Sequence, residues 1–204
     1  MITSDMFSLD EALHSLEMDL TGSCASIAAQ SGIPFAILRY APSEEFLFRR
    51  KIRLFANSLQ QQHHRSVMFL SLSRLVWNAV RETDGVEYLF KTESQHGIMA
   101  AQNDLKGRLE PQDTCALAAQ VMACVDAFNP KPDLVILVRS GGLAPHVYRS
   151  SALLHELQQA GFSRPTILCY PGSAIAGTDL RFYDLPAEEG LGTYNYRVKI
   201  YGTR

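Results

Sequence analysis

Residues 133–139 read DLVILVR, and this segment decides the fold that the sequence predicts. Its interior is continuously apolar and rich in β-branched side chains, which is typical of a strand buried on both faces of a sheet. Ser140-Gly141-Gly142 follows at once, and Pro145 stands at a favourable first position for a helix. A strand that passes through a tight turn into a helix is the repeating unit of a parallel α/β sheet.

Strands and helices alternate along most of the chain. The sequence predicts strands over 34–40, 66–72, 133–139, 166–170 and about 194–201, and helices over about 9–20, 44–62, 73–81, 113–128 and 145–160. The last strand alternates apolar with polar side chains, as a strand at the edge of a sheet does. We therefore expect an α/β fold: a three-layer domain with a mainly parallel sheet of about four to six strands flanked by helices, Rossmann-like or degenerate P-loop-like without Walker motifs.

Three details complete this prediction. Ser8 and Glu11 form a capping-box pattern, while Ser73 and Asp113 are expected to cap the helices that follow them. Residues 88–106 show no clean period, so their centre is left open as helix or loop, and the structure of residues 85–112 is not predicted.

Composition indicates one globular domain over residues 1–204, since 47% of its residues are apolar and 20% are charged. Lysine and arginine number 19 against 21 aspartates and glutamates, so the net charge of -2 draws the molecule to neither nucleic acid nor an anionic membrane. Apolar runs fall far short of the roughly 18 residues of a spanning helix, and no signal-peptide pattern is seen. We expect a cytoplasmic protein without membrane contact.

Motifs for catalysis and cofactor binding are missing from the sequence. Neither the Walker pattern nor the dinucleotide fingerprint occurs, and no G-x-S-x-G nucleophile motif is found. The four cysteines contain no C-x-x-C pair, and the histidines lack zinc spacing. We expect no catalytic residue, no metal and no cofactor.

The carboxyl ends of the predicted strands form a candidate binding rim, because ligands and partners gather there in open α/β sheets. The candidate partner- or anion-binding residues are Arg139, Gly141, Gly142, His146, Arg149, Gly172, Asp179 and Arg181. Glycines beside a helix start can present backbone N–H groups to an anion. Tight turns in which a side chain would clash explain the same glycines without a ligand.

A second candidate surface is the basic face formed by Arg49, Arg50 and Arg53, which steps of three and four place together on one helix. A phosphate backbone could use these charges. Glu44 and Glu45 dilute them, however, and few aromatic residues are interleaved. The sequence therefore favours a solvated or protein-docking face over direct contact with nucleic acid.

Several short segments, taken in their order, resemble the BrxB family of the bacterial BREX phage-defence systems. They follow a leucine-rich first helix and read PFAILRYAP at 34–42, DLVIL at 133–137, RSSALL at 149–154, YPG at 170–172, LRF at 180–182 and YNYR at 194–197. The resemblance covers most of the chain and is most specific after Asp133.

The resemblance implies a small subunit that acts with other BREX proteins, foremost the alkaline-phosphatase-like protein PglZ and also the large ATPase BrxC. It carries over no catalytic residues. We therefore expect a non-catalytic assembly or adaptor subunit that docks through the rim loops and the strand at 194–201. The alternatives are a degenerate nucleotide- or phosphate-binding domain that uses Arg139, the glycine turn and Arg181, and direct DNA contact through the basic face.

Overall fold

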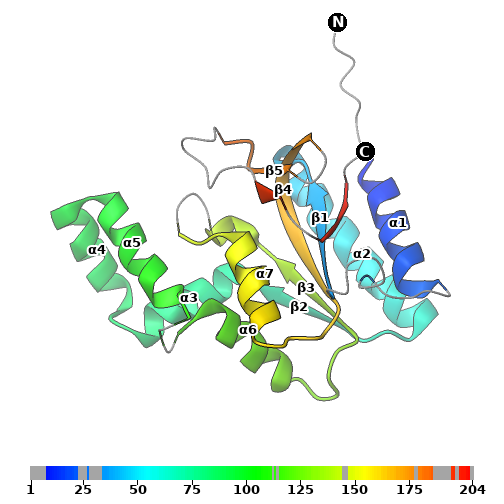
Figure 1. Cartoon of the computed structure of the whole chain (residues 1–204), viewed down its shortest axis with the longest axis horizontal. Coiled ribbons are helices and arrows are strands. Elements are labelled where there is room, and N and C mark those ends of the chain that lie inside the picture. The colour runs from blue at the N-terminus through cyan, green and yellow to red at the C-terminus, as the bar shows by residue number, and fades with distance from the viewer. Residues whose placement is uncertain are drawn as a thin grey trace, which may run out of the picture.

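The structure is a computed structural model, and it describes residues 8–22, 27, 34–111, 113, 115–143, 147–176, 179–185, 194–195 and 198–202 (Figure 1). The elements in chain order are α1 (Leu9–Thr21), β1 (Phe35–Tyr40), the 3-10 turn η1 (Pro42–Glu44), α2 (Glu45–His63), β2 (Val67–Ser71), α3 (Leu72–Glu82), α4 (Gly85–His96), α5 (Ile98–Leu109), α6 (Leu117–Asp126), β3 (Leu134–Val138), the 3-10 turn η2 (Ser140–Leu143), α7 (Ser150–Gln159), β4 (Thr166–Ala176), β5 (Asp179–Phe182), β6 (Tyr194–Asn195) and β7 (Lys199–Tyr201).

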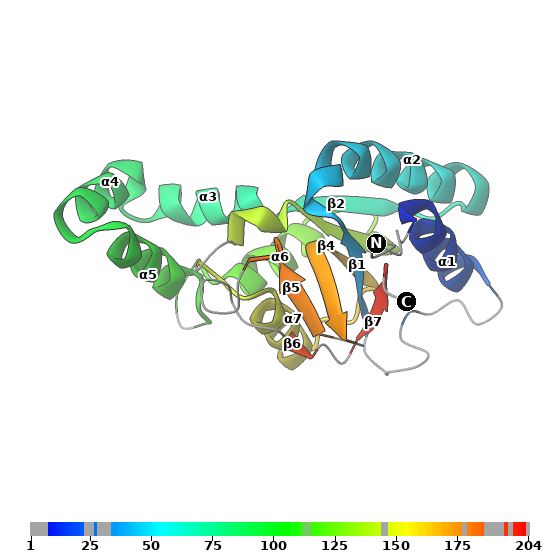
Figure 2. The ribbon, with the colours of Figure 1, turned by 90° about the horizontal axis from the view of Figure 1, so that it is seen from above.

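The strands form a mainly parallel sheet in the order β2-β3-β4-β1-β7. Each neighbouring pair on this path runs parallel, so the carboxyl ends of these strands share one rim. Beyond the rim, the second half of β4 pairs antiparallel with β5, and β5 pairs with β6 (Figure 2). The expected α/β class and the common rim are both confirmed.

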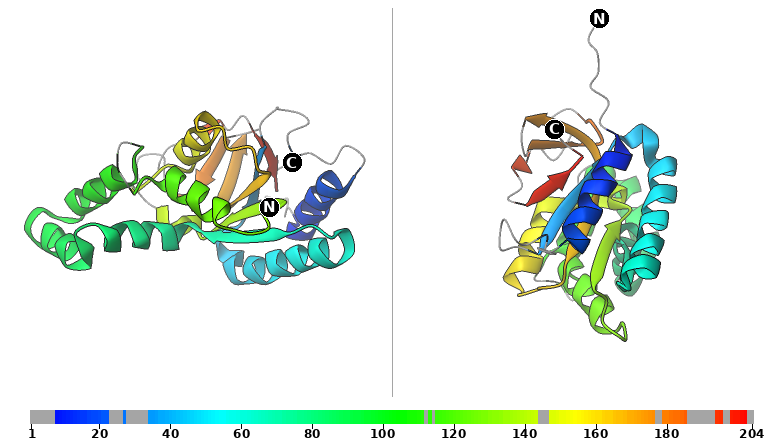
Figure 3. Two further views of the ribbon diagram at one scale, coloured as in Figure 1. Left: turned by 90° about the horizontal axis from the view of Figure 1, so that it is seen from below. Right: turned by 90° about the vertical axis from the view of Figure 1, so that its right-hand side faces the viewer.

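Helices cover both faces of the sheet, which gives three layers (Figure 3). On β1, Ala36 and Leu38 pack into the core shared with α1 and α2, while Phe35 and Ile37 pack into the core shared with α3, α6 and α7. Residues 134–137 of β3 are all buried. Apolar side chains are therefore needed on both sides of these strands, and this accounts for their unbroken apolar sequence.

Helices α4 and α5 form a hairpin that projects away from the sheet beyond α3 (Figures 1 and 2). This hairpin occupies most of the segment for which the sequence gives no expected structure. In α4, all of which the structure describes, no residue is buried, and α5 buries only Ala101 and Leu109. Because the two helices bury so few side chains, the apolar periodicity that marks a core-facing helix is weak here.

The predicted caps are confirmed only in part. Ser8 stands at the N-cap position of α1, but its side chain makes no capping hydrogen bond, and its carbonyl accepts from the Ala12 N–H at 3.2 Å. Helix α3 is capped by Ser71, whose hydroxyl accepts from the Arg74 N–H at 3.3 Å. Ser73 already lies inside the helix, and its hydroxyl is used for a contact with β3 described below.

Several predicted boundaries also shift. The Asp113 carboxylate accepts from the Cys115 N–H at 2.9 Å in a turn, so α6 begins only at Leu117. Helix α7 begins at residue 150 and not near 145. The predicted strand at 194–201 is divided between β6 and β7, with residues 196–197 outside the described part.

The edge position predicted for the last strand is confirmed for β7, which ends the path of parallel strands. Tyr201 falls on the side expected to be polar, yet it is buried in the core beside α1. The reason is a hydrogen bond, because the Tyr201 hydroxyl donates to the Asp19 carboxylate at 2.5 Å. Lys199 donates to the same carboxylate, so β7 is tied to α1 by two side chains.

Candidate functional site

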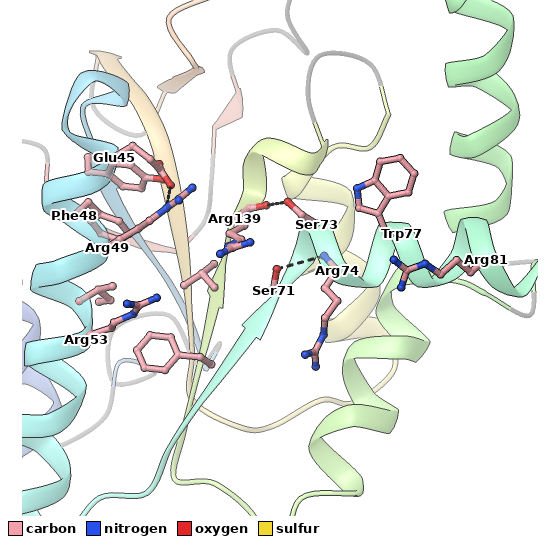
Figure 4. Close-up of a pocket in the computed structure, with 14 residues that line it drawn as sticks. Glu45, Phe48, Arg49, Arg53, Ser71, Ser73, Arg74, Trp77, Arg81 and Arg139 are labelled. Carbon is pink, nitrogen blue, oxygen red and sulfur yellow. Dashed lines mark hydrogen bonds and ion pairs between the residues drawn. The ribbon is translucent and has the colours of Figure 1, made fainter. Parts of the chain in front are cut away.

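A groove of about 620 Å³ lies at the rim, between the first half of α2 and one face of α3 (Figure 4). The ends of β2 and β3 contribute Phe69, Ser71, Val138 and Arg139 to its lining. We call it the cationic groove, because five arginines line it: Arg49 and Arg53 from α2, Arg74 and Arg81 from α3, and Arg139 from the residue after β3.

Glu45 supplies the carboxylate in the lining of the cationic groove, and both of its oxygens are engaged. One accepts from Arg49 Nε at 2.7 Å, and the other accepts from the Tyr40 hydroxyl at 2.5 Å. The Tyr40 ring stacks on Phe48 with 3.7 Å between ring centroids, which fixes the hydroxyl in place. Burial, and then the contact with Glu45, raise the pKa of Tyr40, so this hydroxyl stays a donor.

Pairing with Glu45 therefore neutralises only Arg49. Among the described residues, Arg53, Arg74, Arg81 and Arg139 take part in no ion pair. All four side chains are exposed to solvent. The cationic groove thus carries an excess of positive charge in a molecule whose net charge is -2.

Arg139 owes its position to the turn after β3. Its φ of 58° lies in the left-handed region, which non-glycine residues seldom adopt. The turn is fastened to α3, because the Ser73 hydroxyl donates to the Arg139 carbonyl at 2.8 Å. Gly142 allows this approach, since a Cβ there would lie 2.5 Å from Ser73 Oγ and 2.8 Å from Ser73 Cα. Packing between η2 and α3 therefore brings Arg139 to the middle of the cationic groove.

Two aromatic side chains stand exposed among these charges. Trp77 is 49% exposed and Phe69 is 39% exposed, and both line the cationic groove. Arg74, Trp77 and Arg81 lie three and seven positions apart on α3, so they share one face of the helix. Sequence reasoning missed this face, although its signal was present as polar and aromatic residues interleaved with the buried stripe of α3.

The two candidate sets from the sequence meet only in part. Arg49 and Arg53 of the basic face lie in the cationic groove together with Arg139 of the rim set. Arg50 lies outside it, in shallower hollows on the outer side of α2 that also include Leu54.

The glycines of the rim set are explained by close packing. A Cβ on Gly141 would lie 2.4 Å from the Tyr183 hydroxyl, and one on Gly142 would meet Ser73. At Gly172 a Cβ would lie 2.0 Å from the Arg181 carbonyl, where β5 crosses close to β4. Packing of this kind is what the tight-turn interpretation requires. A role for these glycines in anion or partner binding stays a prediction.

Of the remaining rim residues, Arg149 and Arg181 do not line the cationic groove. Arg149 is exposed at the start of α7. Arg181 is partly buried in β5, and within the described residues its Nε has no hydrogen-bond partner. Asp179 is also in β5, but its side chain lies outside the described part, as does the whole of His146.

Neither a candidate metal site nor a membrane-spanning helix is present among the described residues. There, no group of three or more histidine, cysteine, aspartate or glutamate side chains could hold a metal ion. None of the helices described combines the length and the apolar character that crossing a bilayer demands.

Together these features define a three-layer α/β protein with an arginine-lined groove at its rim and a projecting helical hairpin. Residues 68–200 match the family model described as "BREX protein BrxB". This match covers more than half of the chain, so the chain belongs to the BrxB family and is a component of a BREX phage-defence system. No curated protein and no solved structure was found to match it.

Proposed function

We propose that the protein is a non-catalytic assembly subunit of its BREX system, and that the α4–α5 hairpin is its docking element for other BREX proteins. The observation that carries this proposal is the exposure of large apolar side chains on the hairpin. They are Tyr88, Phe90, Ile98 and Met99, and Phe90 is 65% exposed. Large apolar side chains left exposed on a protruding element are typical of protein–protein contact sites.

The hairpin is held rigid at its base, which suits a docking element. Arg108 Nη2 donates to Asp84 at 2.6 Å and lies 3.0 Å from Asp104, so one side chain bridges the start of α4 and the body of α5. The Arg108 guanidinium also lies over the Tyr88 ring, 5.3 Å from its centroid. A partner would therefore meet a preformed helical surface.

The chemistry of the cationic groove supports binding without catalysis. Arginine stays protonated at physiological pH, so it attracts anions but supplies neither a nucleophile nor a general base. Glu45, the carboxylate in the lining, is already engaged by Arg49 and Tyr40. On this proposal the reactions of the defence system belong to its other proteins.

The PglZ-like protein is the partner we propose for the hairpin, with the large ATPase BrxC as the second choice. The test is retention of each purified BREX protein by the immobilised full chain. We expect the double variant Phe90→Asp/Ile98→Asp to weaken retention of PglZ at least roughly thirtyfold, as loss of an interface hot spot does.

Leu54→Asp provides the matched control, because Leu54 is equally exposed but lies on α2, away from the hairpin. It should retain PglZ like the unmodified chain. Unchanged binding of PglZ by the Phe90/Ile98 variant would overturn the hairpin assignment, and failure to retain any BREX protein would overturn the assembly role.

A further inference from the structure

We propose that the cationic groove binds single-stranded nucleic acid, with phosphates on its arginines and a base stacked on Trp77. This site is separate from the hairpin, so it goes beyond the assembly role. It rests on three observations of the described residues: the local excess of positive charge, the placement of the arginines on opposite walls, and the exposed aromatic side chains.

The structure removes the charge argument against nucleic acid. In sequence, Glu44 and Glu45 dilute the basic face of α2. In the folded protein Glu45 is engaged by Arg49 and Tyr40, and Glu44 does not line the cationic groove. Three further arginines, from α3 and from the end of β3, join those of α2. The local charge is therefore strongly positive, as a polyanion requires.

The arginines are spread along the cationic groove and not gathered at one point. Arg49 and Arg53 reach in from α2, Arg74 and Arg81 project from α3, and Arg139 lies between the two helices (Figure 4). A single phosphate would engage only one or two of them. An extended chain with a phosphate on every residue could engage them in succession, and each guanidinium can bind a phosphate through two parallel hydrogen bonds.

The exposed aromatic side chains indicate which class of polyanion fits the cationic groove. Trp77 and Phe69 are exposed beside the arginines, and nucleic-acid bases stack on such rings in proteins that bind single strands. A duplex hides the faces of its bases, so it would use the arginines but not Trp77. An acidic protein segment would satisfy the arginines and leave the half-exposed indole without a flat partner. Single-stranded nucleic acid satisfies both features.

Trp77 provides the measurement, because it is the one tryptophan of the 204-residue sequence. We expect a mixed-sequence DNA strand of about 16 nucleotides to quench the fluorescence of the full chain saturably. The logarithm of the association constant should fall linearly with the logarithm of salt concentration, by about 0.7 for each phosphate contacted. The duplex of the same sequence should bind more weakly and quench less.

Two groups of variants assign the site. Arg53→Gln/Arg74→Gln should lower the salt slope by about 0.7 for each arginine replaced. Lys91→Gln/Lys131→Gln removes the same charge from exposed lysines outside the cationic groove and should leave the slope unchanged. Trp77→Ala, followed by anisotropy of a labelled strand, should weaken binding about tenfold, whereas Trp77→Phe should keep most of the affinity.

Three outcomes would overturn the proposal. The first is no binding of the strand at about 50 mM salt. The second is binding of polyglutamate as tight as that of DNA, which would indicate an acidic protein partner. The third is equal binding of inorganic polyphosphate together with an unchanged affinity of Trp77→Ala, which would reveal an electrostatic patch only. Circular dichroism of every variant separates loss of binding from loss of fold.

Discussion

Arg139 is the residue where strand, turn and groove meet. It closes the segment from which the fold can be predicted, so sequence reasoning places it at the rim. Its neighbours could not be predicted in the same way, because Ser73, which holds its carbonyl, lies 66 positions earlier in the chain. Local patterns identify single residues at strand ends, whereas the residues that contact them depend on which strands become neighbours in the sheet.

A substitution at Gly142 tests how closely η2 and α3 must approach. We expect Gly142→Ala to lower the free energy of unfolding by about 1–3 kcal/mol, since the new Cβ would press against the backbone of Ser73. Gly107→Ala is the matched control. Gly107 lies in α5 with no atom within 4 Å of its Cβ position, so this change should stabilise the protein by about 0.5 kcal/mol. Urea denaturation measures both, and equal effects would contradict the packing argument.

The carboxylate of Asp19 gives the contact between α1 and β7 a pH dependence. Burial alone raises the pKa of Asp19, but hydrogen bonds from Lys199 and Tyr201 outweigh it and hold that pKa below its ordinary value. The stabilisation is therefore present above the unfolded pKa of about 3.9 and is lost as the pH falls through the lower, folded value.

Asp19→Asn should be less stable than the unmodified chain at pH 7, by about 0.5–1 kcal/mol because the pair is partly exposed and screened. The difference should shrink as the pH falls below about 3.9. Thermal unfolding across this pH range measures it, and a difference that stays constant would exclude Asp19 as the titrating group.

At the scale of elements, prediction succeeds where one side of an element is fully buried. The predicted bounds of α2 and β3 agree with the structure within a residue or two, because α2 carries one apolar stripe and β3 is an unbroken apolar run. The predicted strand at 166–170 covers only the first half of β4, because Pro171-Gly172 is a strong turn signal in sequence. In the structure β4 continues, because Gly172 pairs with Phe182 of β5 and the Tyr183 N–H donates to the Pro171 carbonyl.

The sequence leaves the segment of the α4–α5 hairpin open between helix and loop, and the stability of the hairpin depends on a few contacts at its base. Arg108→Ala removes the bridge between Asp84 and Asp104. We expect amide exchange to accelerate in residues 85–109 by roughly fivefold, which corresponds to about 1 kcal/mol. Exchange in β3 should not change. Lys106→Ala, which removes only an exposed pair with Glu110, is the control, and an equal effect of both variants would contradict the assignment.

At the scale of the whole molecule, α3 connects the two proposed binding surfaces. One face of α3, from Ser73 to Arg81, borders the cationic groove, and the end of the helix leads into the hairpin. Eleven residues of helix extend over about 16 Å, so Arg74, near the start of α3, lies well away from the hairpin that follows its end. This arrangement follows from tertiary contacts. It could not be predicted from composition, because composition averages the charge over the whole molecule.

The two surfaces should therefore act independently. We expect Phe90→Asp/Ile98→Asp to lose PglZ and keep the affinity for the DNA strand, and Arg53→Gln/Arg74→Gln to do the reverse. Changes at separated sites without shared partners add in free energy, to within about 0.5 kcal/mol. Pull-down and fluorescence titration on the same samples measure this, and loss of both activities in either variant would show that the surfaces are coupled.

Strand β7 pairs with β1, and its Tyr201 reaches a residue 182 positions earlier. During translation the ribosome delivers β1 long before it delivers β7. Until β7 has been synthesised, the edge of β1 that β7 will cover stays unpaired, and unpaired strand edges pair with other chains. A chain truncated before Lys199 should therefore aggregate, and we expect chaperones to bind the unpaired edge of β1 until β7 has been synthesised.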